Sequence, residues 1–123
     1  MAKPPLIYLA LSPAVSDQVE KELEGLRARL VRVSDGEDLI RLCREAPPDL
    51  VIVEEEIPKL DGYAAVLLLK SHTRTARVPV VGVCKCLSME ESEKARDAGC
   101  DDYVCYPFER GELKRAVEKI LRG

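Results

Sequence analysis

The amino-acid sequence predicts an α/β fold in which helices cover both faces of a parallel sheet, a doubly wound arrangement. Five short apolar runs alternate along the chain with five segments whose apolar residues recur at helical spacing. Some runs, such as residues 50–53, are apolar without interruption, which is typical of strands that are buried on both faces. A helix between consecutive strands makes them parallel, because the chain must cross back over the sheet.

The first half of the chain contains two strand–helix units. Residues 6–11 form an apolar run, and Ser12 and Pro13 after it are typical of a helix start. One helix face is then predicted from the apolar residues Val15, Val19, Leu23, Leu26 and Leu30. Residues 31–33 predict a short strand at a sheet edge, and Asp35 predicts the N-cap of a second helix.

The second half repeats the alternation three times. Residues 50–53 predict a strand and residues 63–70 a helix, while residues 78–84 predict the fourth strand. The sequence Ser-Met-Glu-Glu at 88–91 matches a capping box and opens a mostly polar helix. Residues 102–105 predict the fifth strand. The apolar positions of the last helix are Leu113, Ala116, Val117, Ile120 and Leu121.

Composition sets limits on the function. The 123 residues fit one domain, 1–123, and 46% apolar with 33% charged residues is typical of a folded globular chain. The net charge is -3 and the basic residues form no dense run, which argues against nucleic-acid binding. The apolar run near the N-terminus is too short to span a membrane, so a cytoplasmic protein is expected.

Ligands bind doubly wound sheets at the carboxyl ends of the strands, so the residues there decide the chemistry. Those ends are Ala10–Leu11, Glu54–Glu56, Cys84–Cys86 and Cys105–Tyr106. Three consecutive acids at 54–56 do not indicate a cation site, because successive strand residues point to opposite sides.

At this point the chain resembles the receiver domain of bacterial response regulators over essentially its whole length. The stretches that carry the resemblance are Pro48–Val53, Ile57–Tyr63, Val78–Val81, Ala98–Tyr103 and Pro107–Phe108. The resemblance implies a flavodoxin-like sheet of five parallel strands in the order 2-1-3-4-5 with five helices. It also implies a role in two-component or phosphorelay signal transduction.

The family's phosphorylation site is altered at every position in this sequence. In the family an Asp accepts the phosphoryl group, two acids hold Mg²⁺, and a hydroxyl residue and a lysine bind the phosphoryl oxygens. The resemblance places these roles on Glu54, Ala10, Leu11, Cys84 and Tyr106. Alanine and leucine offer no oxygen to Mg²⁺, and glutamate is one methylene longer than aspartate. A degenerate pseudo-receiver is therefore expected, with no cofactor and no enzymatic activity, acting through protein–protein interaction.

Glu54 has two interpretations. It is either a fixed mimic of the phosphorylated state or a solvated acid without a role. The second is favoured, because the lysine and the hydroxyl that would sense its charge are missing. On that interpretation, Glu54→Gln leaves partner affinity nearly unchanged.

The resemblance also indicates a partner surface, formed by the fourth helix, the fifth strand and the fifth helix. Tyr103 matches the family's switch aromatic. The basic residues expected on or near this surface are Lys94, Arg96, Arg110 and Lys114. They favour an acidic partner, which would be a histidine kinase, an output protein or a second copy of the chain. Tyr106 is expected to fill the vacant phosphate pocket, and its bond to Pro107 is expected to be cis.

Two other functions stay open. The chain could be a true phosphoacceptor, modified at Glu54 or Asp61. It could also be a thiol-based redox or metal sensor using Cys84, Cys86 and Cys105, which lie near neighbouring strand ends. The cysteines show no metal-ligand spacing, so plain packing of free thiols is the default expectation.

Overall fold

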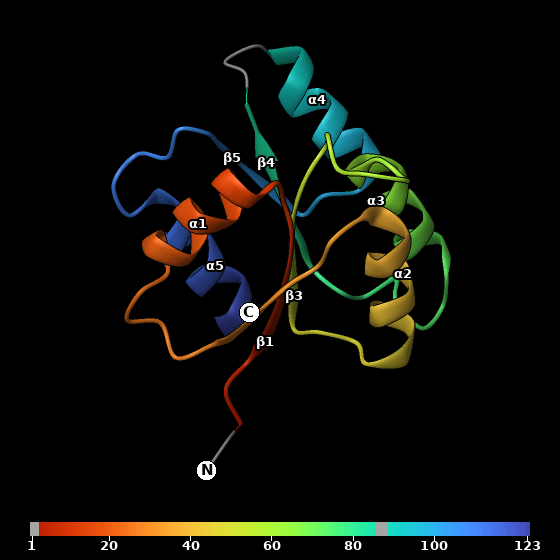
Figure 1. The fold of residues 1–123 in the computed structure, drawn as a ribbon, viewed down its shortest axis with the longest axis horizontal. Helices are drawn as coiled ribbons and strands as arrows, with labels where there is room; N and C mark the ends of the chain where they lie inside the picture. The colour runs from red at the N-terminus through yellow and green to blue at the C-terminus, as the bar shows by residue number, and fades with distance from the viewer. Residues whose placement is uncertain (1–2, 86–88) are drawn as a thin grey trace.

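The computed structural model describes residues 3–85 and 89–123. Five parallel strands form one sheet in the order β2-β1-β3-β4-β5, as the resemblance implied (Figure 1). The strands are β1 (Leu6–Ala10), β2 (Arg29–Arg32), β3 (Leu50–Glu54), β4 (Val80–Cys84) and β5 (Asp102–Cys105). The helices are α1 (Pro13–Glu22), α2 (Gly36–Glu45), α3 (Gly62–Ser71), α4 (Met89–Ala98) and α5 (Glu112–Arg122).

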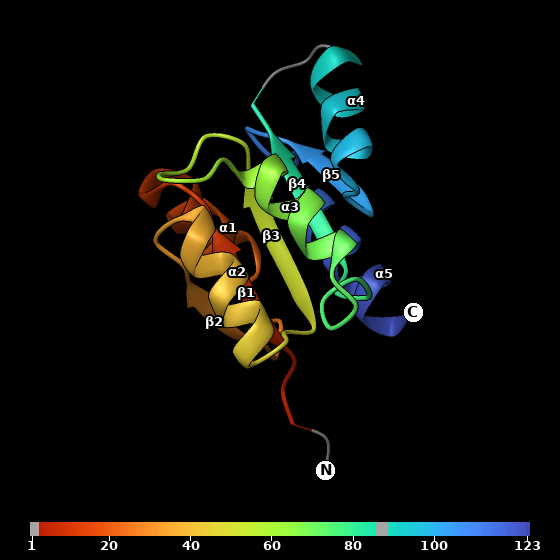
Figure 2. The ribbon, with the colours of Figure 1, turned by 90° about the vertical axis from the view of Figure 1, so that its right-hand side faces the viewer.

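The sheet separates two apolar cores. Helices α1 and α5 cover one face, while α2, α3 and α4 cover the other (Figures 1 and 2). Along β3, Val51 and Val53 face the second group of helices, and Leu50 and Ile52 face the first. All four are fully buried, which is the physical reason that this strand is apolar without interruption.

The first helix is shorter than its apolar spacing predicted. Helix α1 ends at Glu22, and Leu30 lies in β2. Gly25 breaks the helix with a φ of 87°, a left-handed conformation that glycine adopts without steric cost. Leu26 and Leu30 still pack on the core between α1 and α5, so their apolar character reflects burial and not helical periodicity.

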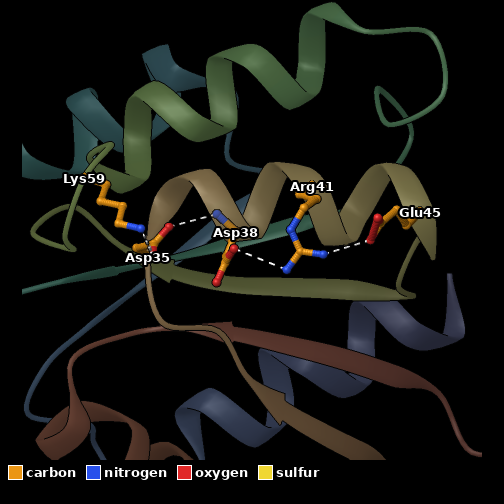
Figure 3. Close-up of polar contacts among 5 residues, drawn as sticks. All are labelled: Asp35, Asp38, Arg41, Glu45 and Lys59. Atoms are coloured by element: carbon orange, nitrogen blue, oxygen red, sulfur yellow. Dashed lines mark hydrogen bonds and ion pairs between the residues drawn. The ribbon is translucent and has the colours of Figure 1, made fainter.

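Aspartates cap helices α2 and α3. The Asp35 carboxylate accepts a hydrogen bond from the backbone N–H of Asp38 at 2.8 Å and lies 3.6 Å from Lys59 Nζ (Figure 3). Arg41, further along α2, bridges Asp38 and Glu45 on the exposed face (Figure 3). The Asp61 carboxylate accepts from the N–H of Ala64 and caps α3. The capping box proposed for α4 includes Ser88, which lies outside the described residues.

Replacing Asp35 is expected to destabilise the fold in a pH-dependent way. The Asp38 N–H, followed by the Lys59 charge, lowers the pKa of the Asp35 carboxyl. A carboxyl whose pKa is lower when folded stabilises the protein above its unfolded pKa, and this contribution is lost as the pH falls through the folded pKa. Asp35→Ala should therefore lower the Tm at neutral pH, with a gap to wild type that narrows below about pH 4.

Asp35→Asn is the matched control for this prediction, because asparagine keeps an oxygen that can cap the helix but carries no charge. Its Tm at neutral pH should lie between those of the wild type and Asp35→Ala. Thermal unfolding of the three proteins between neutral and acidic pH measures this. A gap that stays constant across that range would contradict a contribution from the charge.

Candidate functional site

The carboxyl ends of the strands surround a small cleft at one edge of the sheet. The cleft has a volume of about 210 Å³, and Glu54, the last residue of β3, lies in its wall. The other lining residues are Glu55, Glu56, Tyr63, Val83, Lys85 and Glu91. The cleft therefore combines several carboxylates with a single lysine.

Glu54 is not a solvated acid, so the interpretation favoured from the sequence was wrong on this point. Its side chain is 1% exposed. One carboxylate oxygen accepts a hydrogen bond from the backbone N–H of Ser12, in the loop after β1. The other oxygen, Oε2, lies 3.3 Å from the Nζ atom of Lys85 and accepts no hydrogen bond from any residue that the structure describes. Glu54 thus connects the loops that follow β1 and β4.

Lys85 was missed from the sequence, where the absence of the family's lysine at Tyr106 suggested that nothing would sense the Glu54 charge. Lys85 follows the last residue of β4, and Glu54 pairs with Val83 in the register of β3 and β4. The position of Lys85 directly after the fourth strand could have indicated this contact, because a long side chain just beyond the end of the adjacent strand can reach Glu54. Lys85 is 49% exposed, so water screens its attraction to Glu54 in part.

The positions of the family's metal-binding acids are apolar and buried. Ala10 is fully buried in the core under α2, α3 and α4, and Leu11 is 7% exposed in the core under α1 and α5. Neither side chain has an oxygen. Within residues 3–85 and 89–123, no three His, Cys, Asp or Glu side chains gather in a way that could hold a metal ion.

The hydroxyl position holds a buried thiol. The Sγ atom of Cys84 lies 3.5 Å from the Tyr63 hydroxyl, and burial raises the pKa of both groups. Cys105 is the partner of Cys84 in the register of β4 and β5, so the expected proximity of these two residues is observed. Cys86 lies outside the described residues. Burial also raises the pKa of Cys100, which packs near Gly82, to about 12. These raised pKa values disfavour the reactive thiolate.

Tyr106 does not line the cleft, although the sequence predicted that it would fill the phosphate pocket. Its ring packs on the core beneath α1 and α5 and makes an edge-to-face contact with Phe108, with 5.3 Å between the ring centroids. The backbone after β5 carries the side chain to that face of the sheet. The Tyr106–Pro107 peptide bond is cis.

The expected partner surface contains only part of the predicted basic group. The Arg96 guanidinium lies 5.9 Å from the centre of the Tyr103 ring, and an Arg96 nitrogen donates to the Tyr103 hydroxyl at 3.4 Å. Tyr103 is half-buried and packs on the core beneath α2, α3 and α4. Arg110 is exposed in the loop between β5 and α5.

Lys94 and Lys114 lie on α4 and α5, as expected, but their side chains extend toward other loops. The Nζ atom of Lys94 lies 3.1 Å from Glu55 Oε2, which directs the side chain toward the loop between β3 and α3. The Nζ atom of Lys114 lies near Gly25 in the loop between α1 and β2. Helical position alone does not show which neighbouring loop a long side chain reaches.

No helix within the described residues is both long and apolar enough to cross a membrane.

Comparison with known proteins agrees with the fold. The chain is 29% identical over 119 residues to the DNA-binding dual master transcriptional regulator RpaA of Synechocystis, covering 97% of this chain and 49% of that protein. It is 32% identical over 110 residues to the transcriptional regulatory protein PrrA of Mycobacterium leprae, covering 87% and 46%. The chain thus spans about half the length of these curated relatives.

Solved structures show the same architecture. The receiver domain of the sensor histidine kinase PA1611 from Pseudomonas aeruginosa superimposes with a TM-score of 0.88 at 26% identity, covering 98% of this chain and 99% of that one. Its structure holds a magnesium ion in the active site cleft. A chain from Chloroflexus aurantiacus, solved as a candidate response regulator, superimposes with a TM-score of 0.92 at 25% identity, covering 98% and 100%. The sequence model of the family described as the response regulator receiver domain matches residues 12–118 of this chain. With both sequence and fold in agreement, the chain belongs to the response regulator receiver domain family.

Proposed function

We propose that this receiver domain works without phosphorylation, as a protein-binding pseudo-receiver and not as an enzyme. The observation that carries the proposal is the state of Glu54. Its carboxylate is buried and is already bound by the Ser12 N–H and faced by Lys85. The Glu54 side chain therefore fills the space that an incoming phosphoryl group would need. It also engages the donor and the cation that could stabilise such a group.

The residues present do not fit a magnesium ion. Mg²⁺ requires oxygen ligands in near-octahedral geometry, and the positions that hold it in the family are Ala10 and Leu11. Both are buried in apolar cores, and one Glu54 oxygen already accepts the Ser12 N–H. Without the ion, phosphoryl transfer loses the main electrostatic stabilisation of its transition state.

The partner would bind at the surface around Tyr103. The Arg96 guanidinium lies over the Tyr103 ring, and this cation favours a carboxylate on the partner at this point. A histidine kinase, an output protein or a second copy of the chain are the partner classes that membership of the family suggests.

A second candidate, phosphorylation at Glu54, is favoured by one observation. Lys85 supplies a cation near the acceptor position, and in the family a lysine from β5 does so. Asp61 is less suited to this role, since its carboxylate caps α3. The redox alternative, which relied on Cys84, Cys86 and Cys105, has weaker support, because burial raises the pKa of Cys84 and so disfavours its reactive thiolate.

An amide NMR titration with Mg²⁺, followed by beryllofluoride as a phosphoryl mimic, tests the proposal. The expected result is that no resonance near Glu54, Cys84 or Tyr106 shifts with saturation, and that acetyl phosphate adds no phosphoryl mass to the protein. The receiver domain of PA1611, which holds magnesium in its cleft, is the matched positive control. Saturating shifts around Glu54 would overturn the proposal, and a phosphoryl mass located on Glu54 would establish the second candidate.

A further inference from the structure

A groove lies between α3 and α4, two helices that lie side by side on one face of the sheet (Figures 1 and 2). The groove has a volume of about 310 Å³ and is separate from the surface around Tyr103. Its lining residues are Glu55, Asp61, Tyr63, Ala64, Leu67, Lys94, Asp97 and Ala98. Phosphorylation chemistry does not involve it, so the inference stands or falls independently of the proposed function.

The floor of the groove is apolar and accessible. Leu67 is 54% exposed, and Ala64 lies one helical turn before it on the same face of α3. Leu68, the next residue, is 46% exposed outside the groove. Helix α3 is thus apolar on its exposed side as well as on its buried side. An exposed apolar surface of this kind, bordered by polar groups, is typical of a protein-binding site.

The rim of the groove is acidic. Lys94 is the one cation among the lining residues, and Glu55 already pairs with it at 3.1 Å. Glu55 raises the pKa of Lys94 chiefly by hydrogen bonding, and the charges of Glu91 and Asp61 add to the effect. Asp97 adds a further exposed carboxylate at the α4 edge. Three carboxylates, Glu55, Asp61 and Asp97, therefore line the groove with one lysine, and the rim keeps a net negative charge.

We propose that this groove binds a basic amphipathic helix of another protein. The apolar side chains of such a helix would lie on Leu67 and Ala64, in the helix-in-groove mode of recognition. Its lysines or arginines would lie against Asp97, which is outside the Glu55–Lys94 pair, and against Asp61, whose carboxylate also caps α3. The charge of the rim selects this occupant over an acidic or uncharged segment.

The test uses a short synthetic peptide with leucines at helical spacing and lysines elsewhere, and a matched peptide with glutamates in place of the lysines. In amide NMR spectra of the labelled protein, the lysine peptide should cause saturating shifts in residues 61–67 and 94–98. The glutamate peptide should cause none. Shifts spread over other surfaces, or equal responses to both peptides, would overturn the proposal.

Matched variants separate the groove from general charge effects. Asp97→Lys and Leu67→Ser should each lower the affinity for the lysine peptide by about fivefold or more. Glu24→Lys makes the same charge change at an exposed position after α1, outside the groove, and Leu68→Ser removes a neighbouring exposed leucine; both should keep wild-type affinity. Equal losses in Asp97→Lys and Glu24→Lys would show unspecific attraction and overturn the proposal.

A second copy of the chain is the competing occupant. Sedimentation velocity of the protein alone tests it, and the expected result is that Leu67→Ser leaves the oligomeric state unchanged. If the wild-type protein is a dimer and Leu67→Ser is a monomer, the assignment of the groove to a basic helix of another protein is overturned.

Discussion

Replacing Glu54 with alanine is expected to destabilise the protein and to release the loops that follow β1 and β4. The substitution leaves the Ser12 N–H without its acceptor in a half-buried place, which costs about 1–3 kcal/mol. It also empties the space of a side chain that is 1% exposed, which adds a cavity cost. Lys85 loses its ion pair at little cost, because it is half-exposed and can turn to water. Urea unfolding measures the loss, and amide NMR should show shifts at Ser12 and Lys85.

Two variants make this prediction specific. Glu54→Gln keeps an oxygen for the Ser12 N–H but cannot attract Lys85, so its loss of stability should be smaller than that of Glu54→Ala. Glu56→Ala removes an exposed carboxylate two residues away and should change the free energy of unfolding little. If Glu54→Ala is as stable as Glu56→Ala, the carboxylate does not hold the two loops together.

The burial of Glu54 also changes the effect that Glu54→Gln is expected to have on partner affinity. If the partner contacts the loops that follow β1 and β4, Glu54→Gln should weaken binding of the partner. A solvated acid, in contrast, could be replaced without effect. The sequence favoured the second outcome because the lysine and the hydroxyl that would sense the Glu54 charge were missing, whereas the structure places Lys85 beside the carboxylate.

The fold could be predicted from the sequence because the three central strands, β1, β3 and β4, are almost entirely buried and therefore apolar without interruption. The order of the strands came from family resemblance, and the buried run of β3 came from the apolar character of residues 50–53. The end of α1 could not be predicted in this way. Leu26 and Leu30 extend the helical spacing by coincidence, since both are buried for reasons of tertiary packing after the chain turns at Gly25.

The site was predicted only in part, because side-chain reach depends on neighbours that are distant in sequence. Glu54, Glu55 and Glu56 look alike in the sequence, yet the structure buries the first, half-buries the second and exposes the third. Glu54 still belongs to the strand, and the start of α3 covers it. Lys94 and Lys114 could be placed on their helices but not on a surface, since each extends toward a different loop.

Replacing Gly62 with alanine is expected to destabilise the protein by about 2–3 kcal/mol, because it presses the first turn of α3 into the end of β3. A Cβ atom at Gly62 would lie 1.9 Å from the carbonyl oxygen of Glu54 and 2.7 Å from Cγ2 of Val53. No rotation of a side chain relieves a clash with the backbone, so α3 must move away. The Gly62 N–H also donates to the Glu55 carbonyl at 2.8 Å, a bond that this movement strains.

Gly82→Ala is the matched control, since Gly82 is equally buried but lies in the middle of β4. A Cβ atom there would meet the Cys100 Sγ atom at 3.2 Å and the Ala95 Cβ atom at 3.4 Å, which are side-chain contacts that small shifts can relieve. Its effect on urea unfolding should therefore be clearly smaller than that of Gly62→Ala. Because Gly62 touches the backbone of Glu54, Gly62→Ala should also shift the amide resonances of Ser12 and Lys85. Equal stability losses in the two variants would mean that the contact of α3 with the end of β3 is no tighter than ordinary core packing, and that the position of Glu54 does not depend on it.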